Sequence, residues 1–293
     1  MTEAQFASQM QERKAWLETA LAESLKHTLK STAEISQAGF SQLKDAISYS
    51  FLQKGKRFRP LLGLMVAETF AVHPQKIIPW AAAIEMVHIF SLIHDDLPCM
   101  DDDDLRRGEP TSHKIYGEAM ALLAGDALLT EAFREISRAY QREPEKALQL
   151  VNLLAEATGL LGMVGGQAID LSAQEQKISL ADLKVMHAMK TGALIRASIE
   201  GAAVACGLSA EKVQICRQFG TQLGLAFQIK DDLMDSTAEH IEKGSFPEIL
   251  GLSESQKYLE EISKECVAQL NKLAISENGL LSQMVQYNLQ RKI

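Results

Sequence analysis

The sequence predicts an all-α fold, a single large helical bundle around a deep central cavity. Ala, Leu, Gln, Glu, Lys and Met dominate the chain, and runs with strand-like alternation are hard to find. Prolines punctuate the first half up to Pro144, and none follows until Pro247, which leaves room for long unbroken helices. Hydrophobic residues make up 46% of the 293 residues, enough for a sizeable core.

Local signals place the elements in order. Met1 to Leu25 mixes charged and apolar residues at helical spacing, Pro60 suits a helix start, and Pro98 interrupts a long apolar helix. Ser179 and Ser253 each open a helix-start pattern, the second with capping-box spacing. We therefore expect helices at residues 3–28, 39–52, 58–72, 77–97, 117–140, 144–160, 163–174, 180–206, 210–235, 254–275 and 279–289.

Two of these stretches, Ile77–Ile93 and Gly192–Leu208, are apolar on most faces. A helix that is hydrophobic all round belongs in the middle of a bundle, and a polar site at the end of such a helix would form the mouth of an apolar cavity. The sequence shows no low-complexity linker, no repeat of solenoid period and no composition shift. We expect one domain over residues 1–293.

Charge and cysteine usage narrow the class of protein. The formal net charge of −8 argues against a general nucleic-acid partner. The longest near-apolar run, Ile77–Ile84, is broken by Pro79, so we expect no membrane span, and the N-terminus lacks the apolar core of a signal peptide. The scattered cysteines without CxxC spacing favour reduced thiols in a cytoplasmic protein. They are Cys99, Cys206, Cys216 and Cys266.

The first of two aspartate-rich clusters begins with Asp95 and Asp96, and after Pro98 it continues through four aspartates, Asp101–Asp104. Carboxylates this close repel one another, and hard cations such as Mg²⁺ prefer carboxylate oxygens. The adjacent Arg106-Arg107 pair indicates that a phosphate completes the site. The alternative is a charged surface loop. Because Pro98 interrupts the helix, we expect the loop to bring Asp101 back beside Asp95.

The second cluster is Asp231, Asp232 and Asp235, more than a hundred residues further along. In a helix these residues fall within an arc of about 100°, and Asp231 and Asp235 can converge on one cation. An isolated motif of this kind is as often a solvated acidic helix face. Here the preceding segment, Leu223–Ile229, is apolar, so the acidic group ends a core helix abruptly.

Basic residues that suit these acids are grouped as well. Lys54–Pro60 puts four cations just before an apolar helix, and a helix N-terminus with adjacent Lys and Arg binds phosphate well. Taken alone, such a segment is more often a solvated turn. His88 shares roughly one helix face with Asp95. A lone helical histidine is usually a packed polar residue, and only the neighbourhood favours a role in binding.

In combination these motifs resemble the trans-polyprenyl diphosphate synthases, most closely the bacterial farnesyl diphosphate synthases, over nearly the whole chain. The resemblance implies the all-α isoprenoid synthase bundle. The segments that carry it are Gly55–Pro60 (like GKRxRP), Asp95–Gly108 (the longer first aspartate-rich motif), Gly165–Asp170 (like GGQxxD), Lys190–Gly192 (like KTG) and Phe227–Asp235 (the second aspartate-rich motif).

The resemblance implies a reaction in which an allylic diphosphate ionises, isopentenyl diphosphate attacks the carbocation, and a proton leaves. The departing diphosphate takes that proton in the family, so no side-chain base is required. The product would be farnesyl diphosphate, made by adding isopentenyl diphosphate to dimethylallyl and geranyl diphosphate with the help of three Mg²⁺ ions. Mg²⁺ and preorganised cations suit the charge that develops on the leaving group.

The resemblance also assigns roles to residues of this chain. Mg²⁺ binding falls to Asp95, Asp101 and Asp231, with Asp96 and Asp235 in support. Isopentenyl diphosphate binding falls to Lys56, Arg59, His88 and Arg107. Allylic diphosphate binding falls to Arg106 and Lys190. The residues expected to line the carbocation as catalytic groups are Lys190, Thr191 and Gln228.

Phe90 lies five residues before Asp95 on the same predicted helix. A bulky ring there would form the floor of the cavity in which the product tail grows, and in the family it is similar to the aromatic of farnesyl-producing enzymes. A smaller residue would be typical of geranylgeranyl producers. The alternative is that Phe90 is ordinary core packing.

The segment after Asp235 departs from the family, whose members usually carry a longer loop with two lysines. Lys243 matches the later lysine, and Lys230 is not an obvious substitute for the earlier one. Loss of one charge-assisted contact would weaken allylic diphosphate binding by roughly 1.5–3 kcal/mol. The shorter segment also lacks residues that could serve as a lid over the active site. The C-terminal Arg291-Lys292 pair offers a compensating charge.

Alternatives to a farnesyl diphosphate synthase stay open at this point. Geranylgeranyl diphosphate synthesis is the nearest. A class I terpene cyclase also uses an aspartate-rich motif with Mg²⁺, although it needs neither a second cluster nor a basic site. A non-catalytic subunit of a heteromeric synthase is the third. We expect a homodimer, and we expect the two clusters to meet across one apolar tunnel.

Overall fold

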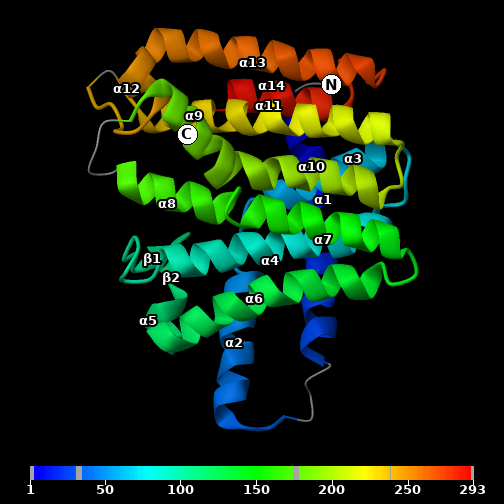
Figure 1. The fold of residues 1–293 in the computed structure, drawn as a ribbon, viewed down its shortest axis with the longest axis vertical. Helices are drawn as coiled ribbons and strands as arrows, with labels where there is room; N and C mark the ends of the chain where they lie inside the picture. The colour runs from blue at the N-terminus through cyan, green and yellow to red at the C-terminus, as the bar shows by residue number, and fades with distance from the viewer. Residues whose placement is uncertain (1–2, 31–34, 174–177, 238, 292–293) are drawn as a thin grey trace. The chain divides into compact units, whose positions relative to one another are not determined.

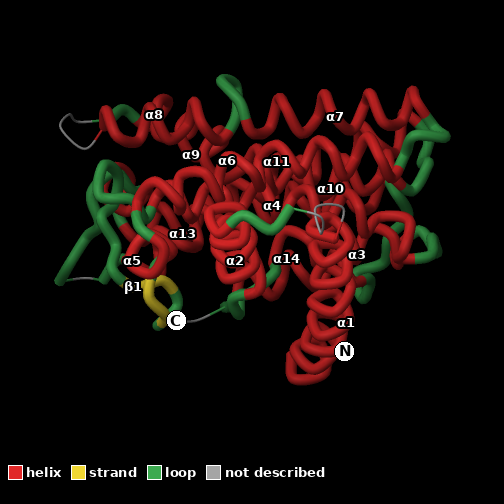
Figure 2. The backbone as a smooth tube through the Cα atoms, turned by 90° about the horizontal axis from the view of Figure 1, so that it is seen from below, coloured by secondary structure: helices red, strands yellow, loops and turns green. Residues whose placement is uncertain are grey.

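The computed structural model describes residues 3–30, 35–173, 178–237 and 239–291, and it is all-α as predicted (Figures 1 and 2). Over these residues Figure 2 shows helices throughout, and the only strands form a small two-stranded element. The elements are α1 (Glu3–Lys30), α2 (Ala38–Leu52), α3 (Phe58–Thr69), η1 (Pro74–Ile77), α4 (Ile78–Asp95), β1 (Leu105–Arg106), β2 (Glu109–Pro110), α5 (Ser112–Tyr116), α6 (Glu118–Ala139), α7 (Pro144–Thr158), α8 (Met163–Ala173), α9 (Leu180–His187), η2 (Ala188–Gly192), α10 (Ala193–Ala205), α11 (Ala210–Asp235), α12 (Phe246–Leu250), α13 (Leu252–Lys272) and α14 (Leu280–Gln290).

The helices gather into two compact units. Unit 1 consists of Met1–Ser8, Leu62–Pro74 and Asn152–Ile293, and unit 2 consists of Gln9–Leu61 and Gln75–Val151. The expectation of one domain over residues 1–293 stays a prediction, as does the central cavity.

Unit 2 is built on α4, which lies beside α6 along most of its length, with α2 packed against both (Figure 1). Helix α4 is buried from Ile78 to Ile93 with few exceptions, as expected for an apolar core helix. The two helices approach closely at Gly125, where an added Cβ would lie 2.3 Å from His94 Nε2. The His94 ring therefore occupies the space that a side chain on α6 would need.

Unit 1 is built on α11, which packs against α10 on one side and α13 on the other. Every residue of α10 except Arg196 is buried, which confirms the expectation for Gly192–Leu208 as far as Cys206. A second apolar cluster lies where α9, α11, α12 and α13 meet. Its buried members are Leu183, Met186, Ala226, Ile229, Phe246, Leu259 and Ile262.

Most predicted helices are confirmed to within a few residues, and the exceptions have local causes. The helix expected over 180–206 is interrupted by a π-helical turn at Ala188–Gly192. The helix expected to continue to residue 72 ends at Thr69, where Ala71 adopts a φ of 52°. Ser253 does not cap its helix, because α13 begins at Leu252 after Gly251, whose φ is 83°.

Four short elements were not expected: η1, α5, α12 and the β1–β2 hairpin. Ser245 caps α12 by accepting a hydrogen bond from the Glu248 amide. The hairpin turns through Arg107 and Gly108, with φ values of 57° and 83°. Positive φ at both central residues is the type I′ pattern, whose sequence signal is Asn-Gly, Asp-Gly or Gly-Gly. Arg107-Gly108 has only the glycine of that signal, and the strands are two residues long, so the sequence did not predict the hairpin.

The described residues include two segments that have the length and composition of a membrane-spanning helix. Two segments, Pro74–Asp95 and Pro144–Ala173, are long and apolar enough by composition to cross a bilayer, and 72% of the apolar window in the first is buried inside the protein. Burial of that kind is also typical of a core helix, so the expectation of no membrane span stays a prediction.

The four cysteines are free thiols, and burial raises the pKa of Cys216 to about 12.

Close packing in unit 1 depends on Gly224, where an added Cβ would lie 2.9 Å from the Gly192 Cα. We expect Gly224→Ala to lower the free energy of unfolding by about 2 kcal/mol, since backbone has to move. Urea denaturation measures the change. Gly39→Ala on α2 is the control, because a Cβ there meets nothing within 4 Å, and it should be neutral or slightly stabilising. Equal stability of the Gly224 and Gly39 variants would contradict the packing argument.

Candidate functional site

The basic loop, which we define as residues Gln53–Arg59, connects α2 to α3 and divides its cations between two environments. The Arg57 side chain is buried, whereas Lys56 is exposed and Arg59 is partly buried. Arg57 donates hydrogen bonds to Glu85 and to two backbone carbonyls, so its charge is used inside the protein. The sequence analysis assigned only Lys56 and Arg59 of this segment to diphosphate binding, and the burial of Arg57 is compatible with its absence from that assignment.

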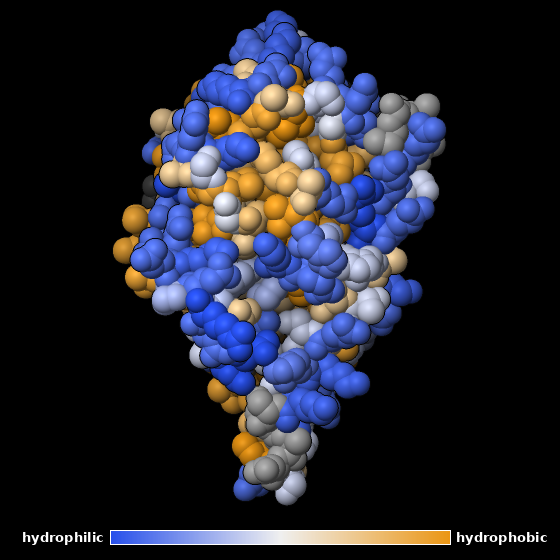
Figure 3. Space-filling model, turned by 90° about the vertical axis from the view of Figure 1, so that its right-hand side faces the viewer, coloured by the Kyte–Doolittle hydropathy of each residue, from blue (hydrophilic) through white to orange (hydrophobic). Residues whose placement is uncertain are grey.

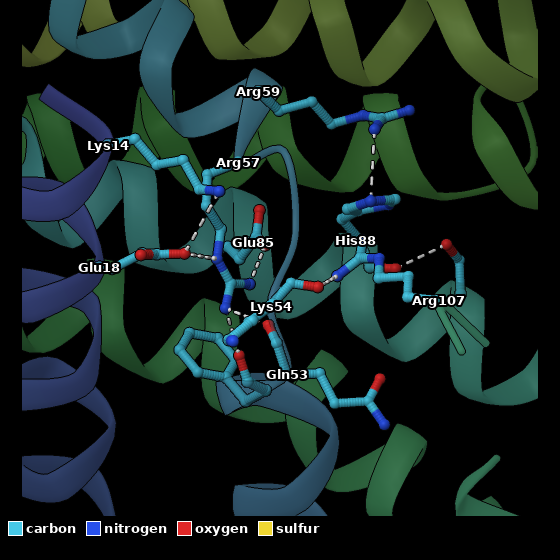
Figure 4. Close-up of polar contacts among 11 residues, drawn as sticks. Lys14, Glu18, Gln53, Lys54, Arg57, Arg59, Glu85, His88 and Arg107 are labelled. Carbon is cyan, nitrogen blue, oxygen red and sulfur yellow. Dashed lines mark hydrogen bonds and ion pairs between the residues drawn. The ribbon is translucent and has the colours of Figure 1, made fainter. Parts of the chain in front are cut away.

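Arg59 and His88 lie together, as the family assignment requires of two ligands for one diphosphate. Arg59 Nη1 is 3.5 Å from His88 Nε2 (Figure 4). Burial lowers the pKa of His88 well below its usual value, and the positive charges of Arg59, Arg107, Arg57 and Arg106 lower it further. His88 is therefore neutral at pH 7, with one ring nitrogen able to donate and the other able to accept.

Arg107 stands at the tip of the β1–β2 hairpin and reaches the basic loop. Its Nη1 donates to the Lys54 carbonyl at 3.1 Å. The guanidinium rests where a side chain on residue 55 would be, because a Cβ on Gly55 would lie 2.3 Å from Arg107 Nη1. The left-handed backbone at Arg107 costs about 1–2 kcal/mol for a non-glycine residue. Strain retained at a predicted ligand supports the functional assignment.

Within unit 2 the structure thus brings together Arg59, His88 and Arg107, three of the four residues that the family resemblance assigns to isopentenyl diphosphate. The fourth, Lys56, is exposed in the basic loop between Lys54, whose carbonyl Arg107 contacts, and Arg59. Two clefts open beside them. One is lined by Ser50, Ile89, Asp96, Arg106, Arg107 and Thr111 among others, and the other, larger and more open, by Tyr49, Gln53, Lys54, Arg107, Glu109 and Tyr116 among others.

The first aspartate cluster folds back on itself as expected. The Asp101 amide donates to the Asp95 carbonyl at 2.8 Å, and this bond returns the loop to the end of α4. Asp96 differs from its neighbours because it is buried and forms an ion pair with Arg106, whose Nε donates at 2.7 Å. Burial raises the pKa of Asp96, and the hydrogen bond from Arg106 opposes that rise.

Asp96 and Arg106 were expected to bind Mg²⁺ and the allylic diphosphate, respectively. The structure pairs them with each other, and Arg106 also contacts Asp103 at 3.0 Å. A guanidinium held by two carboxylates keeps its charge near the cluster, so it stays available to an anion that displaces one of them. Asp101 is exposed beside them.

The three members of the second cluster differ in burial: Asp232 is buried, Asp231 is partly buried and Asp235 is exposed. Asp232 is 3% exposed; its Oδ1 accepts from Gln228 Nε2 at 2.8 Å and its Oδ2 from the Phe246 amide at 2.9 Å. His187 Nε2 lies 3.5 Å from the same carboxylate. Asp232 therefore fixes the start of α12, and it holds Gln228, which we expected to line the carbocation. Asp235, an expected metal ligand, is exposed.

Asp231 is paired with the C-terminal arginine. Arg291 Nη2 lies 2.6 Å from Asp231 Oδ1, and the same nitrogen donates to the Phe227 carbonyl at 3.0 Å. The guanidinium also lies 4.2 Å from the centre of the Phe227 ring. The C-terminal cation suggested by the sequence thus does reach the second aspartate cluster. Lys292 lies outside the described residues.

Lys190 and Thr191 lie in the π-helical turn between α9 and α10. Turns of this kind are frequent at functional sites because they release backbone groups from the regular ladder. Lys190 forms an ion pair with Asp170 of α8, the acidic residue of the GGQxxD-like segment. The two elements meet at Gly166, where an added Cβ would lie 2.2 Å from the Lys190 amide nitrogen. Residue 166 must therefore be glycine for α8 to lie this close to the π-helical turn.

The shortened segment after Asp235 folds compactly in its described part. The Glu242 amide donates to Ser236 Oγ at 3.2 Å, and the Thr237 amide donates to the His240 carbonyl at 2.7 Å. Lys243 is exposed next to Gly244, whose φ is 66°. Burial raises the pKa of Glu242, and the negative charges of Asp232 and Asp235 raise it further, as expected for a crowded acidic region.

Phe90 faces the interior of unit 2. It is 7% exposed, and its ring lies edge-on to His94 with the centroids 5.0 Å apart. Five residues of helix put Phe90 about 7.5 Å further along α4 than Asp95. That depth is consistent with the floor of a cavity, although ordinary core packing has the same appearance.

The donor chemistry fits Mg²⁺ bound together with a substrate. Among the described residues no three His, Cys, Asp or Glu side chains are close enough to hold a metal by themselves. Mg²⁺ is usually held by one or two carboxylates plus substrate phosphates, and keeps several waters. Carboxylates with exposed oxygen donors at Asp101 and Asp235 meet that requirement.

Sequence reasoning missed the residues whose partners come from distant segments. Glu85, the buried partner of Arg57, and the interior position of Asp232 are the main cases. A glutamate inside the apolar run Ile77–Ile93 was a usable signal for Glu85, since a buried carboxylate requires a cation. Nothing in the spacing of the second motif distinguishes Asp232 from Asp231.

Comparison with known proteins gives three findings. The family profile described as polyprenyl synthetase matches residues 40–246. The chain is 40% identical over 252 residues to the farnesyl diphosphate synthase of Bacillus subtilis (strain 168), covering 81% of this chain and 85% of that protein. It is 36% identical over 266 residues to geranylgeranyl pyrophosphate synthase 7 of Arabidopsis thaliana, covering 86% and 77%.

The fold is also similar to a solved structure. An FPP/GFPP synthase from Zymomonas mobilis in its apo form superposes with a TM-score of 0.85 at 32% sequence identity, over 98% of this chain and all of that one. The all-α expectation is thereby confirmed at the level of the fold family.

The lowered pKa of His88 predicts a pH effect on stability. The unfolded chain takes up a proton near pH 6.5 and the folded chain does not, so stability is retained above that pH and lost as the pH falls. Between pH 7.5 and 5.5 we expect wild type to lose about 1 kcal/mol more than His88→Gln. Urea denaturation at both pH values measures this. An identical pH dependence in the two proteins would contradict a neutral His88.

Proposed function

Because this chain belongs to the polyprenyl synthetase family, we propose that it condenses isopentenyl diphosphate with dimethylallyl and geranyl diphosphate to give farnesyl diphosphate. The observation that carries the proposal is the basic group of unit 2. It is supported by the contact of Arg59 at the start of α3 with His88 of α4, and by the contact of the hairpin Arg107 with the basic loop that also carries Lys56.

The chemistry follows from charge. The C–O bond of the allylic diphosphate breaks with its electron pair on the diphosphate, the double bond of isopentenyl diphosphate forms the new C–C bond, and the departing diphosphate takes the proton. Mg²⁺, of which we propose three ions, would neutralise charge on the leaving group and bind through Asp95, Asp101, Asp231, Asp96 and Asp235. That both aspartate clusters serve one substrate stays a prediction.

The protein's own groups orient and protect the reactants. Arg59 and Arg107 supply planar donor forks suited to phosphate oxygens, and neutral His88 supplies a further donor. For the allylic diphosphate we propose Lys190 and Lys243 of unit 1 and Arg106 of unit 2 as the binding cations. The oxygens of Lys190, Thr191 and Gln228 would face the carbocation, which requires partial negative charge and no full anion.

Assembly and location belong to the proposal too. Figure 3 shows apolar residues at the surface of one face of the protein. The exposed large apolar residues include Leu122 and Leu123 on α6 and Leu160 and Leu161 after α7. Leu160 and Leu161 are 83% and 74% exposed. Covering such residues gains about 25 cal/mol for each Å² of apolar surface, so we propose a homodimer. We also propose a cytoplasmic location, because free thiols suit a reducing compartment.

A geranylgeranyl product is the second candidate, and relatives of that name favour it. The length of the product depends on the space beyond the first aspartate cluster. Phe90 fills space on α4 at the depth where a longer chain would extend, which supports the shorter product.

The direct test is turnover by the purified protein alone. Incubation with dimethylallyl diphosphate, isopentenyl diphosphate and Mg²⁺ should give farnesyl diphosphate by chromatography, and excess chelator should abolish the product. Light scattering of the same sample should give a dimer mass, and a monomer mass would contradict the homodimer. Failure to consume isopentenyl diphosphate would exclude the synthase and favour a non-catalytic subunit, whereas cyclic products would indicate a terpene cyclase.

Removing the Phe90 ring should lengthen the product. We expect Phe90→Ala to shift the main product by at least one isoprene unit, since the ring no longer blocks the growing tail. Chromatography of the products measures this. Phe40→Ala on α2, where Lys44 covers the ring at 5.5 Å, is the control and should leave the distribution unchanged. An active Phe90 variant with the wild-type distribution would show that Phe90 is only core packing.

A further inference from the structure

Arg57, a residue of the basic loop, caps the C-terminal end of α2 with its side chain. Its side chain is 4% exposed. Nη2 donates to the carbonyls of Phe51 at 2.9 Å and Gln53 at 2.7 Å. The last carbonyls of a helix have no partners inside the helix, so a buried guanidinium on them fixes where the helix ends. The exit of the chain from α2 is therefore set by Arg57.

The other side of the same guanidinium meets acids from two other helices of unit 2. Nη1 donates to Oε1 of Glu85 on α4, a residue that is 1% exposed, and Nε lies 3.8 Å from Glu18 Oε1 on α1. Figure 4 shows the guanidinium between these groups. One side chain thus connects α1, α2 and α4.

The backbone of Arg57 performs a second task. Its carbonyl accepts the Leu61 amide at 3.0 Å and so starts α3. Its φ of 49° lies in the left-handed region, which a non-glycine residue keeps only where the surroundings hold it. Here the surroundings are the bonds of its own buried side chain. Loss of those bonds should release the loop.

Arg59 and His88, the predicted diphosphate ligands, lie close in sequence to the Arg57–Glu85 pair. Arg59 follows Arg57 by two residues, and His88 follows Glu85 by three, which puts both α4 residues on neighbouring positions of one helix face. Figure 4 shows Arg57 directed toward Glu85 and Arg59 directed toward His88. The loop and α4 are therefore aligned at Arg57–Glu85, and Arg59 meets His88 at 3.5 Å as a result.

We propose that Arg57 and Glu85 are positioning residues that hold the basic loop in the conformation that presents Lys56 and Arg59 to the diphosphate of isopentenyl diphosphate. The inference rests on the proposed function for the identity of the anion. Neither side chain touches substrate, since both are buried and bonded to the protein. They contribute by preorganising the basic loop, and this should strengthen the binding of isopentenyl diphosphate and not of the allylic substrate.

Stability and positioning can be separated by experiment. A buried ion pair is often replaced by apolar residues without loss of stability, whereas removal of one partner leaves a buried charge. The variants are therefore Glu85→Gln, the charge-conserving Arg57→Lys, and the double variant Arg57→Met/Glu85→Leu. The readouts are the melting temperature, the KM for each of the two substrates, kcat, and the affinity for inorganic diphosphate by calorimetry.

We expect each variant to raise the KM for isopentenyl diphosphate about tenfold or more, while kcat and the KM for the allylic substrate change less than about threefold. Affinity for inorganic diphosphate should fall in parallel. In the double variant the melting temperature should recover relative to Glu85→Gln, and the raised KM should persist. Recovery of KM together with the melting temperature, or an equal change in all constants, overturns the inference.

An exposed ion pair of the same residue types gives the matched control. Arg134 and Glu131 on α6 lie 2.8 Å apart. The variants Glu131→Gln and Arg134→Lys, and the double variant Arg134→Met/Glu131→Leu, should leave every kinetic constant unchanged. If any of them raises the KM for isopentenyl diphosphate as the Arg57 and Glu85 variants do, the effect is general and the inference fails.

The two proposals fail separately. A wild-type protein that does not turn over isopentenyl diphosphate overturns the proposed function. In that case the affinity for inorganic diphosphate still decides the inference, because Arg57→Lys with wild-type affinity contradicts a positioning role. If the Glu85 variants do not fold, Arg57→Lys provides the same test, since it keeps the charge and loses only the fork that bonds the two carbonyls.

Discussion

Repulsion between like charges is the constraint on which the rest of this structure depends. The chain concentrates aspartates in two short segments and cations in a third, and neither arrangement is stable without opposite charge close by. The protein supplies that charge from its own residues. Arg106 neutralises Asp96, Arg291 neutralises Asp231, and Glu85 neutralises Arg57. Each of these pairs also fixes the position of a backbone segment.

The charged residues differ in whether they are buried in an ion pair or exposed to solvent. Arg57 is enclosed, so its charge serves the interior, whereas Arg107 and Lys56 keep their charge at the surface. The same division holds among the acids, where Asp232 is buried and its neighbour Asp235 is exposed. A cluster of identical residues thus separates into members that build the site and members that are left to bind.

Within each unit, a glycine makes room for one of the predicted diphosphate ligands. Gly55 leaves room for the Arg107 guanidinium, and Gly166 leaves room for the backbone that carries Lys190. Left-handed backbone at Arg57 and Arg107 adds local strain, which is retained at both ends of the same basic group. Glycine and strain are therefore found at the residues that the family resemblance links to diphosphate.

The all-α class, most helix bounds and the identity of the charged motifs could be read from the sequence, because helix periodicity and motif spacing are local properties. The return of Asp101 to Asp95 was also predictable, since Pro98 must break the helix. Local properties could not show that Arg57 is buried against Glu85, or that Asp232 anchors the Phe246 amide. Those roles depend on partners supplied by distant segments, and only the tertiary structure decides which of several equivalent charges meets its counterion away from water.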